Sequence, residues 1–283
     1  MSLKNIIGLL LILTGLIYLV ALLSDQTPVW NHEQVVLDMK EYDALEVEVL
    51  TVLSSSMDIV LTAVEDRDVI SVQLHGAEKH KDHYEIHIDG GSHTRVNIEK
   101  HQQGWFNWGR APSVQIQIPA RQLAQIEVAA TSGDMKLEGV QADRLHMTSS
   151  SGSQTVKRIQ VKRLTMNASS GDMELSESDW HEAELRTGSG SVALPAMAGD
   201  RTVSVKTGSG DVSLDYRVHP ADTTYTFRSG SGDQVIDMDV DLRNLAQSRH
   251  LFSAVAGEGN HYVEISTGSG DIEMRSKSSK THE

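Results

Sequence analysis

Residues 183–194 read AELRTGSGSVAL, residues 203–214 read VSVKTGSGDVSL and residues 263–274 read VEISTGSGDIEM. In each stretch, apolar residues alternate with polar ones on both sides of a Thr-Gly-Ser-Gly corner. Alternation with a period of two is the pattern of a strand that buries one face. Each stretch therefore predicts two short strands joined by a glycine-containing turn.

Related corners recur along the second half of the chain, and their spacing is nearly constant. Their last glycines are Gly133, Gly152, Gly171, Gly190, Gly210, Gly232 and Gly270. The steps between them are 19, 19, 19, 20, 22 and 38 residues. Because 38 is twice 19, we expect one further copy, near Gly257–Gly259, that has lost its signature.

A repeat of 19–22 residues is short for a strand-helix-strand unit, and the connectors show no helical spacing. A single two-strand unit cannot bury its apolar face, so copies must stack and merge their apolar columns into one core. The sequence therefore predicts an all-β fold, a β-solenoid over residues 121–276. A β-sandwich of regular hairpins is the alternative, although a sandwich does not require identical turns at identical spacing.

The first half of the exported part, residues 36–120, alternates in the same way but less regularly. Ser54-Ser55-Ser56-Met57-Asp58 resembles a degenerate corner, and Met57 lies 76 residues, four periods of 19, before Gly133. We expect this half to supply irregular layers and a cap, which an open solenoid needs in order to hide its terminal strand edges.

Composition and charge restrict the classes of function. The chain has no cysteine, which removes disulfides, zinc ribbons, iron–sulfur clusters and thiol catalysis. Its formal net charge is −14, and no basic stripe is present, so nucleic acid is not an expected partner. We expect no cofactor and no metal ion.

The N-terminal segment predicts a membrane anchor. Ile6–Leu23 is an uncharged apolar run of 18 residues, and as a helix it spans roughly 27 Å, about one bilayer core. Lys4 precedes it, whereas Asp25 and Glu33 follow, so the positive-inside rule places the N-terminus in the cytoplasm. A cleaved signal peptide is the alternative, but Ala21–Ser24 contains no small-x-small cleavage pair.

The predicted organisation follows from these boundaries. It consists of a cytoplasmic tip (1–5), a transmembrane anchor (6–23), a linker (24–35), irregular β layers with a cap (36–120), the regular repeat (121–276) and a polar tail (277–283). Everything after the anchor is expected outside the bacterial cell membrane.

The repeat units resemble a known family, the bacterial β-strand-repeat "putative adhesin" domain of unknown function. The likeness rests on the apolar-x-apolar units around the Ser-Gly-Asp corners, on Ile118-Pro119 and on the closing ISTGSGDIEM, and covers roughly Val36–Met274. The anchored layout is also similar to that of accessory proteins from Gram-positive cell-envelope stress operons. The resemblance implies a right-handed, single-stranded β-helix-like solenoid and no enzyme activity.

The residue after the corner glycine has two interpretations. It is an aspartate in five copies and a serine in two: Asp134, Asp172, Asp211, Asp233, Asp271, Ser153 and Ser191. A column of carboxylates can hold calcium. We favour a structural role, in which glycine supplies a positive φ and the short side chain bonds the turn backbone.

Two clusters in the first half are interpreted separately. Six histidines lie between residues 75 and 101 (His75, His80, His83, His87, His93 and His101). Histidines four apart on a strand are about 13 Å apart, too far to chelate one ion, so a solvated face is expected. The segment 104–110, GWFNWGR, contains Trp105, Phe106, Trp108 and Arg110. Such a segment either caps the solenoid or forms a recognition loop.

No nucleophile elbow, phosphate loop or dinucleotide fingerprint is present. We therefore predict a non-enzymatic protein that acts in binding, scaffolding or signalling at the cell envelope. Its expected partners are the lipid bilayer, through Ile6–Leu23, and an envelope protein or a cell-wall polymer. The alternatives are a polysaccharide-acting β-helix enzyme, which requires charged residues concentrated on one strand face, and a polymer-forming scaffold.

Overall fold

A computed structural model of the chain describes residues 35–276, except 79–82, 101–111 and 240. By its internal contacts the chain divides into Met1–Gln34 and Val35–Glu283, and all described residues belong to the second unit. The described part contains no helix that is long and apolar enough to cross a bilayer. The predicted anchor, Ile6–Leu23, lies outside the described residues.

The described residues form an all-β structure. Its strands are β1 (Val35–Asp43), β2 (Val49–Ser56), β3 (Asp58–Val64), β4 (Val69–Gly76), β5 (Tyr84–Asp89), β6 (His93–Lys100), β7 (Ser113–Pro119), β8 (Gln122–Ser132), β9 (Met135–Glu138), β10 (Gln141–Ser151), β11 (Gln154–Lys157), β12 (Gln160–Ser170), β13 (Met173–Ser176), β14 (Asp179–Ser189), β15 (Val192–Ala198), β16 (Thr202–Ser209), β17 (Val212–Val218), β18 (Thr223–Ser231), β19 (Gln234–Asp237), β20 (Arg243–Gln247), β21 (Leu251–Ala256), β22 (His261–Ser269) and β23 (Ile272–Ser276).

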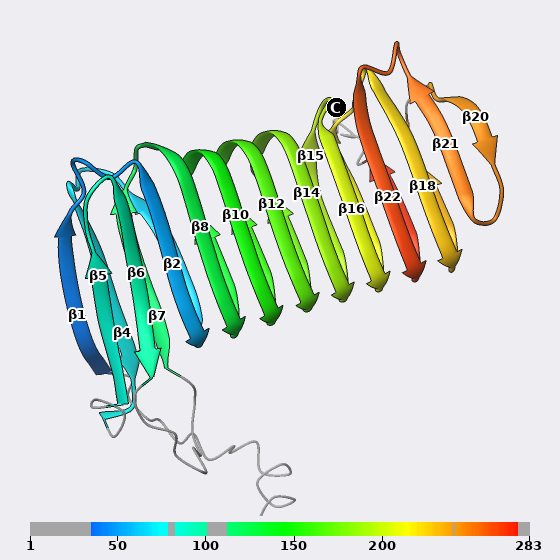
Figure 1. Ribbon diagram of the computed structural model, residues 1–283. Helices are drawn as coiled ribbons and strands as arrows, with labels where there is room; N and C mark the ends of the chain where they lie inside the picture. Colours follow the sequence, from blue (N-terminus) through cyan, green and yellow to red (C-terminus); the bar gives the residue numbers. More distant parts are fainter. Residues whose placement is uncertain (1–34, 79–82, 101–111, 240, 277–283) are drawn as a thin grey trace, which may run out of the picture. The chain divides into compact units, whose positions relative to one another are not determined.

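The strands build two sheets. Sheet A has the order β1-β4-β7-β3-β9-β11-β13-β15-β17-β23-β19, and sheet B has the order β20-β21-β18-β22-β16-β14-β12-β10-β8-β2-β6-β5. Successive strands of one repeat, such as β8 and β9, belong to different sheets, whereas equivalent strands of successive repeats pair in parallel. This arrangement excludes a sandwich of hairpins and is a solenoid-like stack of two-strand layers (Figure 1).

The alternating apolar residues form continuous columns inside the stack. In sheet B, Leu145 pairs with Ile126 on one side and with Leu164 on the other, and each of the three is at most 1% exposed. The corresponding column of sheet A runs through Leu137, Val156 and Leu175. Because the pairing is in register, every inward side chain meets its equivalent in the next layer, and one core joins both sheets.

Two constraints fix the corner glycines. The φ angles of the seven glycines lie between +111° and +147°, a region that other L-residues rarely adopt. In addition, a Cβ atom at any of them would lie 2.0–2.3 Å from a backbone carbonyl oxygen of the adjacent corner. At Gly190, for example, the Cβ would meet the carbonyl oxygen of Gly171 at 2.1 Å. The corners are therefore stacked backbone on backbone.

Side chains of the corners bond the adjacent layer. The Asp134 carboxylate accepts the backbone N–H of Ser153 at 2.8 Å, and the Asp271 carboxylate accepts that of Asp233 at 2.7 Å. The same bond joins Asp58 to Asp134, Asp172 to Ser191 and Asp211 to Asp271. The hydroxyls of Thr187, Thr207 and Thr267 donate to corner glycine carbonyls at 3.1–3.2 Å.

The layers do not follow the order of the chain. The last repeat, β22 with β23, lies between β16/β17 and β18/β19, and in Figure 1 the red β22 separates the yellow β16 from the gold β18. The expected degenerate copy near Gly257–Gly259 is therefore wrong. The preceding residues form the antiparallel strands β20 and β21, and the step of 38 residues arises because the chain overshoots by one layer and returns.

Two aspartates hold this crossover in place. Asp200 Oδ1 accepts the backbone N–H groups of Ala221 and Asp222 at 2.9 and 2.7 Å. The Asp222 carboxylate accepts the backbone N–H of Gly259 at 2.6 Å and the side-chain amide of Asn260 at 2.7 Å. The connection that skips a layer is thus bonded to the residues that lead into the inserted strand β22.

The first half begins the same stack. The expected degenerate corner is confirmed, because a Cβ on Gly133 would meet the carbonyl oxygen of Met57 at 2.3 Å, and β2 and β3 pair in parallel with β8 and β9. Strands β6 and β7 add one more parallel layer. Beyond them the pairing is antiparallel, with β5 next to β6, β4 next to β7 and β1 next to β4.

We expect Gly190→Ala to lower the free energy of unfolding by about 2–5 kcal/mol, because strain at positive φ and overlap with a fixed carbonyl add together. The matched control is Gly199→Ala. Gly199 also has a positive φ, +62°, but no atom lies within 4 Å of the position that a Cβ would take there, so only about 1 kcal/mol is expected. Denaturant unfolding of both variants measures the difference, and equal losses would contradict backbone stacking.

We expect Asp222 to contribute stability that acid removes. The hydrogen bond from the Asn260 side chain, followed by that from the Asn260 backbone, lowers the pKa of the Asp222 carboxyl below its ordinary value. The contribution is therefore complete above the unfolded-state pKa of about 3.9 and is lost as pH falls through the lower folded value. Asp222→Ala should lower Tm at neutral pH and reduce the loss of Tm on acidification, and Asn260→Ala should act in the same direction. Thermal unfolding between about pH 3 and 7 tests both variants.

Candidate binding surface

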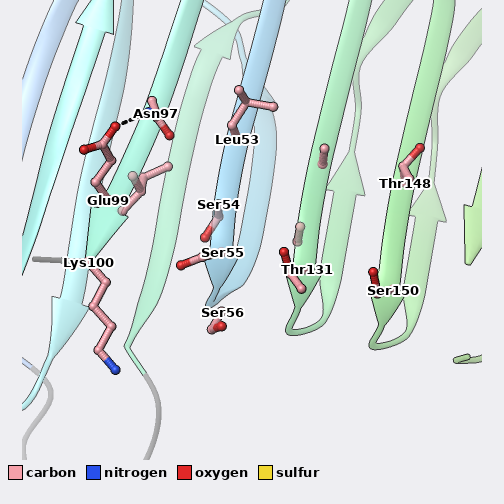
Figure 2. A pocket seen from close by; sticks show the side chains of 13 residues that line it. Leu53, Ser54, Ser55, Ser56, Asn97, Glu99, Lys100, Thr131, Thr148 and Ser150 are labelled. Carbon is pink, nitrogen blue, oxygen red and sulfur yellow. Dashed lines mark hydrogen bonds between the residues drawn. The ribbon is translucent and has the colours of Figure 1, made fainter. Parts of the chain in front are cut away.

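The largest recess of the described structure is an open hollow on sheet B. It has a volume of about 760 Å³ and lies over β6, β2, β8 and β10, near the ends of the strands that lead into the corners. Figure 2 shows the side chains that line it, with Asn97, Glu99 and Lys100 coming from β6 and Thr148 and Ser150 from β10. The hollow is thus formed by two layers of the regular repeat and two of the irregular first half.

Small outward-facing residues create this hollow. Leu53 pairs with Asn97 and with Ala129, and Ala129 pairs with Thr148, so these residues form one row across four strands. Two residues farther along the strands, the next row contains Ser55, Thr131 and Ser150. Their chain neighbours Val128 and Ala130 point into the core. Because short side chains succeed one another on the outer face, the surface is lowered there.

The lining is rich in hydrogen-bonding groups. The Asn97 amide donates to Glu99 Oε1 at 2.6 Å (Figure 2), and Thr148 Oγ1 lies 2.9 Å from His146 Nε2. Serine and threonine hydroxyls supply both donors and acceptors, while Lys100 adds one cation. Leu53 and the alanines add apolar surface. An open surface of this kind suits an extended ligand with many hydroxyl groups, such as a sugar polymer.

The aromatic segment predicted to act in recognition or capping lies outside the described residues, together with its members Trp105, Phe106, Trp108 and Arg110. Its place in the chain is nevertheless informative. Lys100, which lines the hollow, is the last residue of β6, and the segment joins β6 to β7. The chain therefore leaves the hollow and enters this segment directly.

The predicted corner residues occupy one column along the stack, next to the strands but apart from any shared ligand site. The carboxylates of Asp134, Asp172, Asp211 and Asp271 each accept a backbone N–H from the adjacent corner. The described residues contain no group of three or more His, Cys, Asp or Glu side chains placed to hold a metal ion. The carboxylate column thus has a structural use in every pair of layers where these bonds occur.

The predicted histidine cluster is spread over several elements. His87 Nε2 lies 3.4 Å from Glu85 Oε2 on the same face of β5, and both side chains are half-exposed. His75 belongs to β4 in the other sheet, and its Nε2 is buried without a hydrogen-bond partner in the described structure. His80 and His101 lie outside the described residues.

Charged side chains on the outer faces pair with one another across layers. Lys162 Nζ lies 2.8 Å from Asp143 Oδ1, and this hydrogen bond is the main reason why the pKa of Asp143 is lowered. Arg163 pairs with Glu182 at 3.1 Å, and Arg228 with Glu264 at 3.1 Å. In the described part of the chain, the charges are therefore distributed along the stack, unlike the concentrated set that an enzyme of the β-helix type requires.

The sequence did not reveal the hollow. Ser55 was interpreted only as part of a degenerate corner, and Glu99, Lys100 and Thr131 attracted no interpretation. A signal existed in the outward positions of the period-two pattern, where Ala129, Thr131, Thr148 and Ser150 are all small. Which strands lie beside β8 and β10 is set by the pairing of β2 and β6, and local pattern carries no information on that.

Comparisons with known proteins agree with this architecture. A family model described as Toastrack DUF4097 matches residues 47–275, from just before β2 into β23. A solved "putative cell adhesion protein" from Clostridium sporogenes ATCC 15579 is 11% identical, with 87% of this chain and 100% of that chain covered and a TM-score of 0.42. For a "putative adhesin" from Bacteroides fragilis NCTC 9343 the values are 10%, 84%, 96% and 0.49. For a "putative lipid binding protein" from Parabacteroides distasonis ATCC 8503 they are 13%, 85%, 96% and 0.40. No curated protein sequence matches the chain.

Proposed function

Because this chain belongs to the Toastrack DUF4097 family, we propose that it is a non-enzymatic binding protein, held at the outer surface of a bacterial cell membrane, that presents the side of its strand stack to an extended envelope polymer. The observation that carries this proposal is the hollow of about 760 Å³ on sheet B. It is wide, open and lined by hydroxyl groups, which suits a chain-like ligand lying across the strands.

The proposed position in the cell rests on the N-terminal segment. Ile6–Leu23 is long enough to cross a bilayer, and the charges on its two sides favour an N-terminus in the cytoplasm. The folded unit begins at Val35, so about ten residues of linker separate it from the anchor. We propose that a protein arranged in this way serves as an anchored accessory component of the envelope.

The proposed ligand class is a polysaccharide of the cell wall. Sugar hydroxyls pair with the serine, threonine and asparagine groups of the hollow, and aromatic rings stack on the apolar faces of sugars. The aromatic segment that follows Lys100 holds two of the four tryptophans of the chain within four residues, Trp105 and Trp108. We propose that hollow and segment contact the same polymer.

We expect the full-length protein to co-sediment with purified insoluble cell-wall polysaccharide and Thr131→Trp to weaken this binding at least tenfold, about 1.4 kcal/mol. The bulky ring fills the hollow from an exposed outward position, so the core is not disturbed. The matched control is Thr155→Trp, on β11 in sheet A, which should bind like the unaltered protein. Equal binding by all three proteins would exclude the hollow as the site.

We expect the double variant Trp105→Ala/Trp108→Ala to lose the same binding if the aromatic segment contacts the polymer. Thermal unfolding is measured in parallel, because a segment that only caps the stack lowers Tm without changing affinity. A pull-down from envelope fractions with the two proteins then shows whether other partners depend on the segment. Recovery of the same partners at the same level would assign the segment to capping.

We expect the full-length chain to fractionate with membranes and to be released by detergent but not by high salt, since an apolar helix holds it. Deleting residues 1–24 should move the protein into the soluble fraction. A full-length chain that is recovered soluble and shortened at its N-terminus would instead indicate a cleaved signal peptide.

A further inference from the structure

Strand β19 is the one end of the two sheets in the described structure that no antiparallel strand covers. Sheet B continues past β18 with β21 and β20, and at the opposite end of the stack β4 and β5 cover the last parallel layer. β19 pairs with β23 on one side, and on its other side the described residues supply no strand. The backbone of β19 therefore presents an open edge.

The bonds that join successive corners stop at this edge. In the two preceding layers, the Gly210 and Gly270 N–H groups donate to the carbonyl oxygens of Ser269 and Ser231 at 2.9 Å. Among the described residues, the Gly232 N–H has no such acceptor. In the same way, the Asp271 carboxylate accepts the Asp233 N–H at 2.7 Å, whereas the described chain offers no next N–H to the carboxylate of Asp233. The corner is left with a donor and an acceptor set for another layer.

The strand itself repeats this situation. The Ile272 N–H donates to the Asp233 carbonyl oxygen at 3.0 Å, which fixes the phase of the β19–β23 ladder. Because parallel strands bond their neighbour through alternate residues, the backbone groups of Gln234 and Ile236 face the open edge. An added strand would find both N–H groups and both carbonyl groups of these residues within reach.

A cavity of about 240 Å³ adjoins this edge, between β19 and the turn from β20 to β21. Ile236 and Phe252 form its apolar part, and Gln234 and Arg249 contribute polar groups. Both polar atoms of the Gln234 side-chain amide are buried and have no hydrogen-bond partner in the described structure. A buried amide without a partner costs about 1–3 kcal/mol, so a ligand that bonds it has a ready source of affinity.

Charge indicates the kind of segment that fits. Asp233, Asp237, Asp239 and Asp241 all have exposed side chains at this end of the stack. A second copy of the chain would bring the same carboxylates against them, and like charges repel. A segment with lysine or arginine is attracted instead. Val235, which is 48% exposed on β19, adds apolar surface beside the charges.

We propose that β19 is a strand-addition site for an extended, basic segment of a partner polypeptide. The segment pairs with the open edge, donates a backbone N–H to Asp233, accepts from Gly232 and Gln234, and inserts one apolar side chain beside Ile236 and Phe252. Backbone bonds of this type give affinity, and the pockets for alternate side chains give specificity.

The test uses the full-length protein and a labelled peptide, KTGSGKVSL, which copies residues 206–214 with Asp211→Lys. We expect it to bind, as followed by fluorescence anisotropy, and Ile236→Pro to weaken binding at least tenfold. Proline removes an edge-facing N–H but leaves the bonds to β23, which edge strands tolerate. Asp233→Asn should weaken binding as well, whereas the control Asp215→Asn, on the outer face of sheet A, should not.

Four outcomes would overturn the proposal. The peptide fails to bind at concentrations of up to about 1 mM. Ile236→Pro, with unchanged circular dichroism and Tm, binds the peptide as well as the unaltered protein does. Sedimentation shows a dimer that Ile236→Pro dissociates, which makes a second copy the occupant. Deletion of residues 277–283 increases the affinity tenfold or more, which makes the tail of the chain itself the occupant. None of these results depends on the hollow of sheet B.

Discussion

The structure depends on the contact between one corner and the next. Each corner glycine approaches the carbonyl oxygen of its neighbour so closely that no Cβ fits, and the adjacent carboxylate or hydroxyl bonds the same neighbour. Backbones that touch at one point in every layer must also keep the same register along the strands on either side. The parallel pairing, the apolar columns and the spacing of 19–22 residues all follow from this single contact.

A stack of this kind has no internal limit, so its ends need separate solutions. At the N-terminal end, β6/β7 closes the parallel layers and antiparallel strands cover both sheets. At the other end, the chain overshoots, folds back through β20 and β21 and inserts its last repeat inside the stack. The insertion is held by Asp200 and Asp222, but only sheet B receives extra strands, which leaves β19 exposed. The hollow and the open edge thus both lie where the regular repeat meets an irregular part of the chain.

Sequence reasoning was accurate where the pattern is local. The corner glycines, the strands beside them and the all-β class were predicted, and Met57 with Asp58 was recognised as a weakened corner, because each depends on residues a few positions apart. The interpretation of Gly257–Gly259 failed for the opposite reason. A step of 38 residues has the same appearance whether a layer has degenerated or the chain has crossed one, and only the pairing of β22 with both β16 and β18 distinguishes the two cases. For the same reason the hollow, which joins Lys100 to Thr148 across four strands, had no signature.

The sequence by itself determined that this protein is a stack of two-strand layers, because glycine at a positive φ and alternating apolar residues are requirements that each repeat meets alone. The order of the layers, the open edge at β19 and the neighbours that shape the surface hollow were decided only by the tertiary structure. Equivalent repeats offer nearly identical faces, so their local chemistry cannot specify which one lies beside which. That choice is made by the few contacts that differ between layers, such as those of Asp200 and Asp222, and these form only when distant parts of the chain meet.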